Sequence, residues 1–170
     1  MQKNNAKLGF DRAVSFSDAE IRKQRELFRL ISPLPALAKR QDFEQAIIDN
    51  QFVVVMGQTG SGKSTQLTQY LADMPQFENK TVSSNAFSCV IVAYLIKLVI
   101  ILQVICTQPR KIAAVTLTKR VQFEFAGGRE TTESKRWVGC QVGGDSRLHR
   151  DNRIQYMTET VLLNQLTQAE

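Results

Sequence analysis

The sequence has few of the residues from which disulfide frameworks and zinc sites are built. Its 170 residues include three cysteines, Cys89, Cys106 and Cys140, and one histidine, His149. Three is an odd number, and no two cysteines have the short spacing of a zinc knuckle. The sequence therefore argues against a disulfide-stapled fold and a zinc site, and it favours a reducing intracellular setting.

The N-terminal segment also lacks the features of a targeting signal. The stretch "MQKNNAKLGFDRAVSF" has no apolar core with a small-residue cleavage site, and it lacks the Arg/Ser-rich, acid-poor character of a transit peptide. We expect residues 1–16 to be a flexible lead-in. The rest of the chain contains no internal repeat and no low-complexity tract.

The overall composition is that of an ordinary globular domain with an uneven charge distribution. Hydrophobic residues make up 43% and charged residues 22% of the chain, whose formal net charge is +6. Between Thr107 and Gln155 there are ten Lys or Arg residues against five Asp or Glu residues. This basic half suits a polyanionic partner, nucleic acid first, although a merely solvated face is the alternative.

Helical and strand patterns alternate along the chain. Apolar residues at helical spacing predict a helix from Ser17 to Ile31, which "SPLP" at 32–35 ends, and a second helix over 36–50. Further helices are predicted at 111–125 and 159–168, and strands at 52–56, at 104–107, in "WVGCQV" and in "RIQYMT". The 52–56 run is continuously apolar, as in a strand buried on both faces. This alternation predicts an α/β fold with a parallel sheet flanked by helices.

The stretch "GQTGSGKS", residues 57–64, matches the phosphate-binding pattern G-x-x-x-x-G-K-[ST] at every fixed position. Gly60 and Gly62 can adopt backbone angles that turn consecutive N–H groups inward, and the following helix adds its positive end. Lys63 can reach the terminal phosphates, and the Ser64 hydroxyl can ligate Mg²⁺. The predicted ATP- and Mg²⁺-binding residues of this P-loop are Gly57, Gln58, Thr59, Gly60, Ser61, Gly62, Lys63, Ser64 and Thr65.

Four ordered stretches resemble the DEAH-box RNA helicases. "GQTGSGKSTQ" is similar to motif I of that family, "CTQPRKIAAVTLTKRV" at 106–121 to motif Ia, and "YMTETVLL" at 156–163 to motif Ib. "VGCQVGGDSRL" at 138–148 resembles its VGY-x-V stretch, and "LPALAKRQDFEQAIIDNQFVVV" resembles the lead-in to its first RecA-like domain. The resemblance implies an incomplete RecA-like P-loop NTPase domain over 34–170, preceded by a partly helical N-terminal extension over 1–33.

The resemblance also implies roles for three residues outside the P-loop. Arg120 matches the arginine that stacks on adenine, Arg110 would contact the RNA backbone, and Thr158 would touch an RNA phosphate. The implied ligands are ATP, Mg²⁺ and single-stranded RNA, and the implied location is the nucleus or cytoplasm. The chain departs from the family pattern at Thr160, where glycine is usual, and at Cys140, where tyrosine is usual.

The sequence lacks the family's catalytic stretch. It contains no D-E-A-H run, no serine-alanine-threonine motif and no second RecA-like domain, so we predict no catalytic residue. The prediction is an ATP-binding fragment of a DEAH-box RNA helicase that does not turn ATP over alone. The alternatives are a non-catalytic nucleotide- or RNA-binding module, or another P-loop ATPase. A small-molecule kinase leaves "TQPRKIAA" and "YMTETVLL" unexplained.

An apolar block, "FSCVIVAYLIKLVIILQVIC" at 87–106, has no counterpart in the resembled family. A transmembrane helix has the right length of about 20 residues. It would nevertheless bury Lys97, at a cost of roughly 2.5–3.5 kcal/mol, and separate the P-loop from motif Ia, so no membrane association is expected. One hypothesis is a translated intron, since Val82-Ser83 can be encoded by GTAAGT and Leu102-Gln103 by TTGCAG. The other is a true insertion over 82–103 that adds a strand or packs as a helix.

Overall fold

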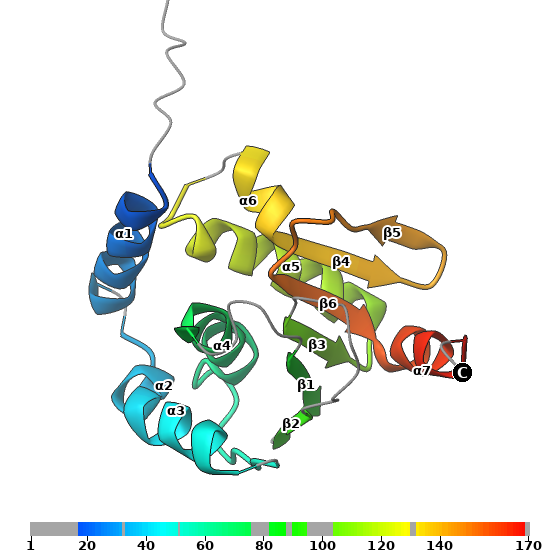
Figure 1. The fold of residues 1–170 in the computed structure, drawn as a ribbon, viewed down its shortest axis with the longest axis horizontal. Helices are drawn as coiled ribbons and strands as arrows, with labels where there is room; N and C mark the ends of the chain where they lie inside the picture. The colour runs from blue at the N-terminus through cyan, green and yellow to red at the C-terminus, as the bar shows by residue number, and fades with distance from the viewer. Residues whose placement is uncertain are drawn as a thin grey trace, which may run out of the picture.

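The computed structural model describes residues 17–31, 33–50, 52–75, 82–87, 90–94, 104–129 and 132–168. One sheet of six strands has the order β2-β1-β3-β6-β4-β5. The strands are β1 (Val82–Phe87), β2 (Val90–Tyr94), β3 (Val104–Gln108), β4 (Val138–Val142), β5 (Asp145–Arg147) and β6 (Ile154–Thr158). The four inner strands are parallel, and the two outer strands are antiparallel to their neighbours (Figure 1). The predicted α/β fold with a parallel sheet is confirmed.

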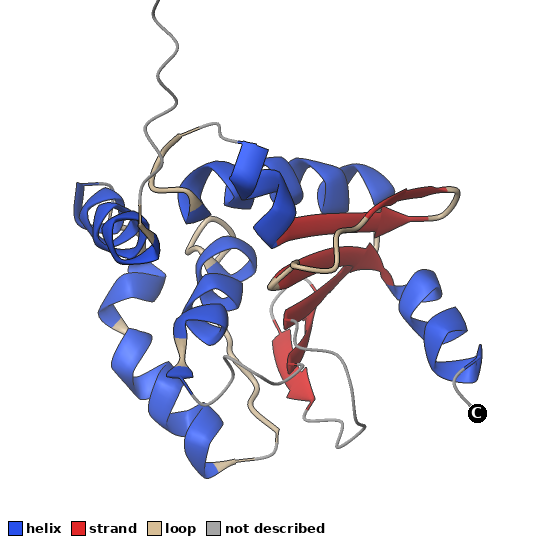
Figure 2. Ribbon diagram, turned by 45° about the horizontal axis from the view of Figure 1, so that its top comes forward, coloured by secondary structure: helices blue, strands red, loops and turns tan. Residues whose placement is uncertain are grey.

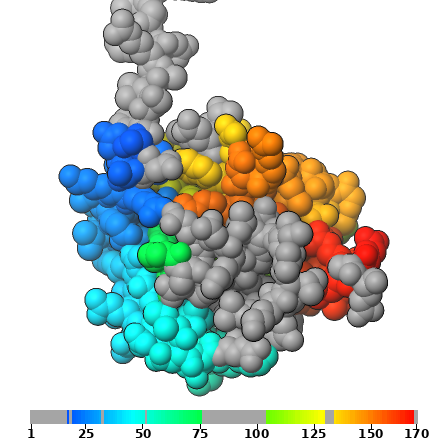
Figure 3. All heavy atoms as spheres, in the orientation of Figure 1, coloured from blue at the N-terminus to red at the C-terminus, as the bar shows by residue number. Residues whose placement is uncertain are grey.

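The described helices lie mainly on one side of this sheet (Figure 2). They are α1 (Asp18–Ile31), α2 (Pro35–Ala38), α3 (Arg40–Asp49), η1 (Lys63–Leu67), α4 (Thr68–Asp73), α5 (Lys111–Phe125), α6 (Thr132–Trp137) and α7 (Glu159–Gln168). Helices α4 and α5 contact the sheet directly, whereas α1 and α3 pack on those two helices. In the space-filling view, α1 and α3 form one flank of the molecule and α7 stands at the other (Figure 3).

The core is built on three neighbouring parallel strands. All residues of β3 and β6 are buried, and β4 is buried at four of its five positions. Tyr156 of β6 is in register with Cys106 on one side and with Cys140 on the other. Cys106 and Cys140 are not joined by a disulfide. Two strand spacings of about 4.8 Å separate them, which is too far for a disulfide.

Local sequence signals fix the ends of α1 and α5. Ser17 and Glu20 form a reciprocal cap, in which Glu20 N–H donates to Ser17 Oγ at 3.3 Å and Ser17 N–H donates to Glu20 Oε2 at 2.8 Å. The bond from the Ser17 N–H lowers the pKa of Glu20. After α5, Gly127 and Gly128 take positive φ values of 70° and 82°, and Gly128 N–H donates to the Phe123 carbonyl at 2.9 Å.

The prediction of a strand at 52–56, buried on both faces, is wrong. Only Val54 forms an isolated bridge, and this run belongs to no strand of the six-stranded sheet. Its side chains alternate: Val53 and Val55 pack against the core, whereas Val54 and Met56 are 61% and 83% exposed. The physical reason is a competition for pairing partners, because β1 occupies the place beside β3.

The apolar block contributes strands rather than a helix where it is described. β1 pairs in parallel with β3, and β2 pairs in antiparallel fashion with β1. These strands agree with the alternative of an insertion that adds to the sheet, and they do not test the translated-intron hypothesis. Residues 95–103 lie outside the described residues, as do 1–16. Among the described helices, none has both the length and the apolar character that crossing a bilayer takes.

Helix α1, which lies within the predicted N-terminal extension, is docked on the rest of the chain through buried charges. Arg25 and Arg29 of α1 both form ion pairs with Asp73, the last residue of α4, and the Arg29–Asp73 distance is 3.1 Å. Arg25 Nε also donates to the Phe125 carbonyl at 2.9 Å. Residues 18–31 therefore pack directly on the predicted domain at 34–170, whose boundaries remain a prediction.

Candidate functional site

The P-loop at Gly57–Ser64 is a glycine turn that leads into a helix. Gly60 and Gly62 adopt φ values of 83° and 95°, which side chains rarely allow. A Cβ at Gly62 would come within 3.1 Å of the Leu34 side chain, so this position also needs glycine for close approach. Ala36 N–H donates to the Ser61 carbonyl at 2.9 Å, which ties the turn to α2. Contacts with Leu34 and Ala36 thus fix the backbone of the turn, and with it the positions of the N–H groups.

The Lys63 ammonium group folds back over this turn. It donates to the Gly57 carbonyl, to the Gln58 carbonyl at 2.7 Å and to Ser61 Oγ at 3.3 Å. Three acceptors orient a cation at the mouth of the loop. A bound phosphate oxygen could replace any of them, because the ammonium is a compact cation with three rotatable donors.

The first turn of the following helix, η1, is π-helical and is fastened to the sheet by one tyrosine. Tyr156 Oη donates to the Ser64 carbonyl at 2.7 Å and shares a 2.9 Å hydrogen bond with Thr68 Oγ1. Tyr156 is completely buried, and burial raises its pKa well above the usual value. It therefore acts as a neutral hydrogen-bonding group that positions Ser64, the predicted Mg²⁺ ligand.

A buried carboxylate lies beneath the same helix. Glu124 of α5 is 3% exposed, and its Oε2 accepts hydrogen bonds from Gln66 at 2.7 Å and Gln69 at 2.9 Å. Its Oε1 accepts from Arg120 Nε. A buried carboxylate is stable only when donors satisfy it, and here two amides and one guanidinium do so. Glu124 thereby links the P-loop helix to Arg120.

Arg120 lies at the edge of a cavity of about 60 Å³ beside the P-loop helix. Its side chain is 57% exposed, so one face of the guanidinium remains accessible to solvent. Phe28 and Arg29 of α1 also line this cavity, together with Tyr70, whose pKa is raised by burial. The cavity thus brings Arg120 and the P-loop helix together with the N-terminal helix.

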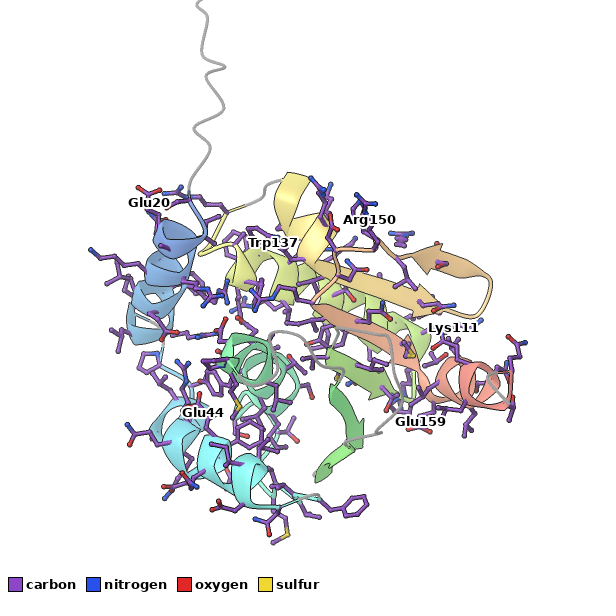
Figure 4. The ribbon with its side chains drawn as sticks, viewed as in Figure 1. Glu20, Glu44, Lys111, Trp137, Arg150 and Glu159 are labelled. Atoms are coloured by element: carbon purple, nitrogen blue, oxygen red, sulfur yellow. The ribbon has the colours of Figure 1, made fainter. Side chains whose placement is uncertain are left out.

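Arg110 and Thr158 lie at the carboxyl ends of neighbouring strands. Thr158 ends β6 and is in register with Gln108, which ends β3 two residues before Arg110. Arg110 is exposed, and its side chain has no hydrogen bond or ion pair within the described ranges. Thr158 is 7% exposed, so only a small part of its surface is accessible to a ligand. Lys111 and Glu159 lie at this same end of the sheet (Figure 4).

The hairpin of β4 and β5 adds a further cation to this edge. Lys111 Nζ donates to the carbonyl of Gly143, in the turn of the hairpin, at 3.3 Å. The strand ends of β3, β4 and β6 therefore present a basic surface at one end of the sheet, which we call the carboxyl edge and define by Arg110, Lys111, Gly143 and Thr158. Polyanions are attracted to such surfaces.

The chain is similar in sequence to several ATP-dependent RNA helicases. It is 36% identical over 139 residues to the chloroplastic ATP-dependent RNA helicase DEAH11 of Arabidopsis thaliana, and 82% of the chain is covered. It is 33% identical over 158 residues, 93% of the chain, to the pre-mRNA-splicing factor ATP-dependent RNA helicase prp22 of Schizosaccharomyces pombe. Over this stretch the chain belongs to the DEAH-box helicase family. No family model matches the chain.

The matched stretch is a small part of these DEAH-box relatives. The chain spans 6% of the length of DEAH11 and 10% of the length of prp22. The probable ATP-dependent RNA helicase spindle-E of Drosophila pseudoobscura pseudoobscura, 36% identical over 133 residues, is covered over 8% of its length. The family assignment therefore concerns the P-loop region and its neighbouring strands.

Within this DEAH-box segment, the sequence did not reveal the buried residues that form hydrogen bonds to the P-loop helix and to Arg120. Glu124, Gln66, Gln69 and Tyr156 were not singled out, although each contacts the P-loop helix or Arg120. The spacing of Arg120 and Glu124, four residues apart on a predicted helix, was a signal that could have found one of them. Nothing local points to Tyr156, which lies 92 residues from its partner Ser64.

The two departures from the DEAH-box pattern have different surroundings. Cys140 is buried in the sheet, and burial raises the pKa of its thiol. Thr160 is exposed in the first turn of α7. Among the described residues, no three His, Cys, Asp or Glu side chains gather into a metal site.

Proposed function

We propose that this chain binds ATP with Mg²⁺ at the P-loop and single-stranded RNA at the carboxyl edge. The observation that carries the proposal is the P-loop itself: two glycines at positive φ, an oriented Lys63 ammonium and a helix that begins directly after them. Consecutive backbone N–H groups and a helix N-terminus form a phosphate site. A Cβ at Gly57 would meet Ser61 Oγ at 3.2 Å, so the close packing of the loop favours glycine at this position as well.

Three of the predicted nucleotide-binding residues are assigned specific roles in this proposal. Lys63 would hold the terminal phosphates, and the Ser64 hydroxyl would bind Mg²⁺, which supplies charge neutralisation when it is present. Arg120, accessible beside the P-loop helix, would stack on the adenine through its planar guanidinium. Glu124 would hold that guanidinium in place.

RNA binding is proposed for the carboxyl edge. Arg110 presents an unshared guanidinium within the described part of the chain, and a planar guanidinium suits bidentate contact with phosphate. Thr158 would add a hydroxyl contact.

The relatives' names describe ATP-dependent RNA helicases, so we propose that the chain is an ATP-binding part of such an enzyme, which couples ATP hydrolysis to RNA unwinding. Its setting would be intracellular.

By itself the chain is proposed to bind ATP without turning it over. Hydrolysis requires a carboxylate that holds Mg²⁺ and a group that positions the attacking water, and the sequence contains no D-E-A-H run. A nucleotide- and RNA-binding module is thus the form of activity expected for the isolated chain.

A fluorescent ATP analogue tests the P-loop. Lys63→Ala should weaken binding at least tenfold, or about 1.4 kcal/mol, because the terminal phosphates lose their cation. Lys39→Ala is the matched control, since Lys39 is exposed and pairs with Asp42 at 2.9 Å. Equal affinity of Lys63→Ala and the parent chain would refute the proposed site. Phosphate release, measured with and without RNA, should stay at the background rate.

A further inference from the structure

A second cavity, of about 70 Å³, lies at the opposite end of the sheet from the carboxyl edge. The described residues that line it are Ile21, Arg22 and Arg25 of α1, Phe125 of α5, Trp137 of α6 and Arg153. Trp137 directly precedes β4 and Arg153 directly precedes β6, so the cavity adjoins the amino ends of these strands. Trp137 lies where α6 meets the sheet (Figure 4). Every charged side chain in this lining is an arginine.

The two inner arginines are held rigidly yet keep donors to spare. Arg25 uses Nε on the Phe125 carbonyl and Nη1 on Asp73. Arg153 donates from Nη2 to the Ala72 carbonyl at 2.5 Å. Arg25 Nη2 and the Nε and Nη1 atoms of Arg153 donate no hydrogen bond to another described residue. These N–H groups are therefore open to a ligand in the cavity.

The Phe125 ring lies close to both guanidinium groups. The Arg25 guanidinium lies 3.5 Å from the centroid of the Phe125 ring, and that of Arg153 lies 5.8 Å from it. Phe125 also packs edge-on against Trp137, with 6.1 Å between ring centroids. Rings that stack on the guanidinium faces leave their N–H edges available.

The positive charges of Arg29 and Arg153 repel that of Arg25. Burial lowers the pKa of Arg25 to about 10, and the charges of Arg29 and Arg153 act in the same direction, against the attraction of Asp73. Asp73 already serves both Arg25 and Arg29. An anion placed between Arg25 and Arg153 would relieve this repulsion.

We propose that this cavity binds a small tetrahedral oxyanion, inorganic phosphate or sulfate, that fastens α1 to the amino ends of β4 and β6. A cavity of about 70 Å³ suits one such ion, because it is far below the roughly 300 Å³ of sites for larger organic ligands. Guanidinium groups bind phosphate through paired, charge-assisted hydrogen bonds. Helix α1 supplies Arg22 and Arg25 and the sheet supplies Arg153, so the ion bridges the N-terminal helix and the domain.

Hydrogen exchange of the full chain tests this site apart from the P-loop. The chain carries Lys63→Ala, so that phosphate bound at the P-loop does not contribute, and sodium phosphate is compared with sodium chloride at equal ionic strength. Amides of 18–31 and 150–154 should exchange about tenfold more slowly when phosphate is at ten times its dissociation constant. Sulfate should act similarly.

Three variants locate the ion. Arg153→Gln should abolish the phosphate-dependent slowing, and so should Arg22→Gln, which changes an exposed arginine and keeps the ion pairs of Arg25 and Arg29 with Asp73. Arg150→Gln is the control, because Arg150 is 91% exposed and does not line the cavity. Equal exchange in phosphate and chloride would overturn the proposal, as would slowing that survives in both Arg153→Gln and Arg22→Gln. The proposed oxyanion site would also be overturned if amide exchange slowed only with a single-stranded RNA and not with phosphate. Failure here leaves the ATP-binding result with Lys63 unaffected.

Discussion

Gly139 shows how one absent side chain permits a close approach in the sheet. A Cβ at this position would lie 2.2 Å from Asn152 Oδ1 and 3.1 Å from the Arg147 carbonyl. Asn152 is fixed, because it accepts from the His149 N–H and donates to the Arg136 carbonyl, both at 2.7 Å. The glycine is therefore required by space and not by a positive φ.

Gly139→Ala should lower the free energy of unfolding by about 2–3 kcal/mol, because the methyl group forces Asn152 out of its two hydrogen bonds. Urea unfolding measures the loss. Gly143→Ala is the control, since its Cβ would meet only the flexible end of Lys111, at 3.3 Å. Equal losses in the two variants would show that Asn152 moves freely.

The two buried tyrosines near the P-loop helix differ in their hydroxyl groups. Tyr156 Oη bonds to the Ser64 carbonyl and Thr68, whereas Tyr70 Oη is buried without a partner among the described residues. Tyr156→Phe should lower the free energy of unfolding by about 1–2 kcal/mol, because the partly buried Ser64 carbonyl and the buried Thr68 hydroxyl lose their hydrogen-bond partner. Tyr70→Phe should cost nothing or stabilise the chain. Thermal unfolding compares them, and a reversed order would contradict the roles assigned here.

Alkaline pH gives a second measurement on Tyr156. Burial raises its folded pKa well above the ordinary value of 10.0. Its contribution to stability is thus complete below about pH 10 and is lost as the pH rises toward the folded pKa, since the unfolded chain then releases the proton more readily. Tyr156→Phe should lose less stability than the parent between pH 9 and 11. Parallel losses would contradict this.

At the scale of elements, α1 is attached by charges more than by its apolar residues. Leu30 and Ile31 are 66% and 79% exposed, whereas Arg25 and Arg29 are almost completely buried against Asp73. The sequence predicted the limits of this helix from its cap and periodicity. Which face packs inward could not be predicted, because it depends on an aspartate 48 residues away.

Asp73→Asn should detach α1 and lower the free energy of unfolding by about 3 kcal/mol, because it removes the carboxylate shared by the buried guanidinium groups of Arg25 and Arg29 and leaves Arg29 with Glu26 alone. Hydrogen exchange over 18–31 and urea unfolding measure the two effects. Asp49→Asn is the control: Asp49 is exposed and accepts only a 2.9 Å bond from Gln45. Unchanged exchange in α1 would mean that its apolar contacts suffice.

Strand assignments show where local pattern fails. β3, β6, α5 and α7 were predicted within about a residue, since each has strong periodicity or a buried run. The predicted helix at 36–50 is divided at Lys39 into α2 and α3, and α6 and β5 were not predicted. The run at 52–56 has strand composition, yet β1 occupies the position beside β3.

At the scale of the whole molecule, the basic carboxyl edge is the surface proposed to bind RNA. Arg110→Gln should weaken binding of a single-stranded RNA about equally for all sequences, and it should reduce the slope of log affinity against log salt by about one. Fluorescence anisotropy across a salt series measures this. Lys23→Gln, which removes an equal charge from exposed α1, should change neither. An unchanged slope in Arg110→Gln would place the RNA elsewhere.

The origin of the apolar block concerns the whole chain. Removing 82–103 would take away both β1 and β2 and uncover the edge of β3. The translated-intron hypothesis stays a prediction: transcripts that retain these codons under every condition would refute it. The strands formed by 82–87 and 90–94 agree with the alternative of an insertion that adds to the sheet.

The sequence by itself determined what depends on neighbouring residues: the glycine turn at 57–64, the cap of α1, the glycine end of α5 and the alternation that makes an α/β fold. Only the tertiary structure decided which strand lies beside β3, that Tyr156 holds Ser64, and that Glu124 joins Gln66 to Arg120. The reason is physical. Turns and caps are set by backbone angles and short-range hydrogen bonds, whereas pairing partners and buried charges are chosen by competition among residues far apart in the chain.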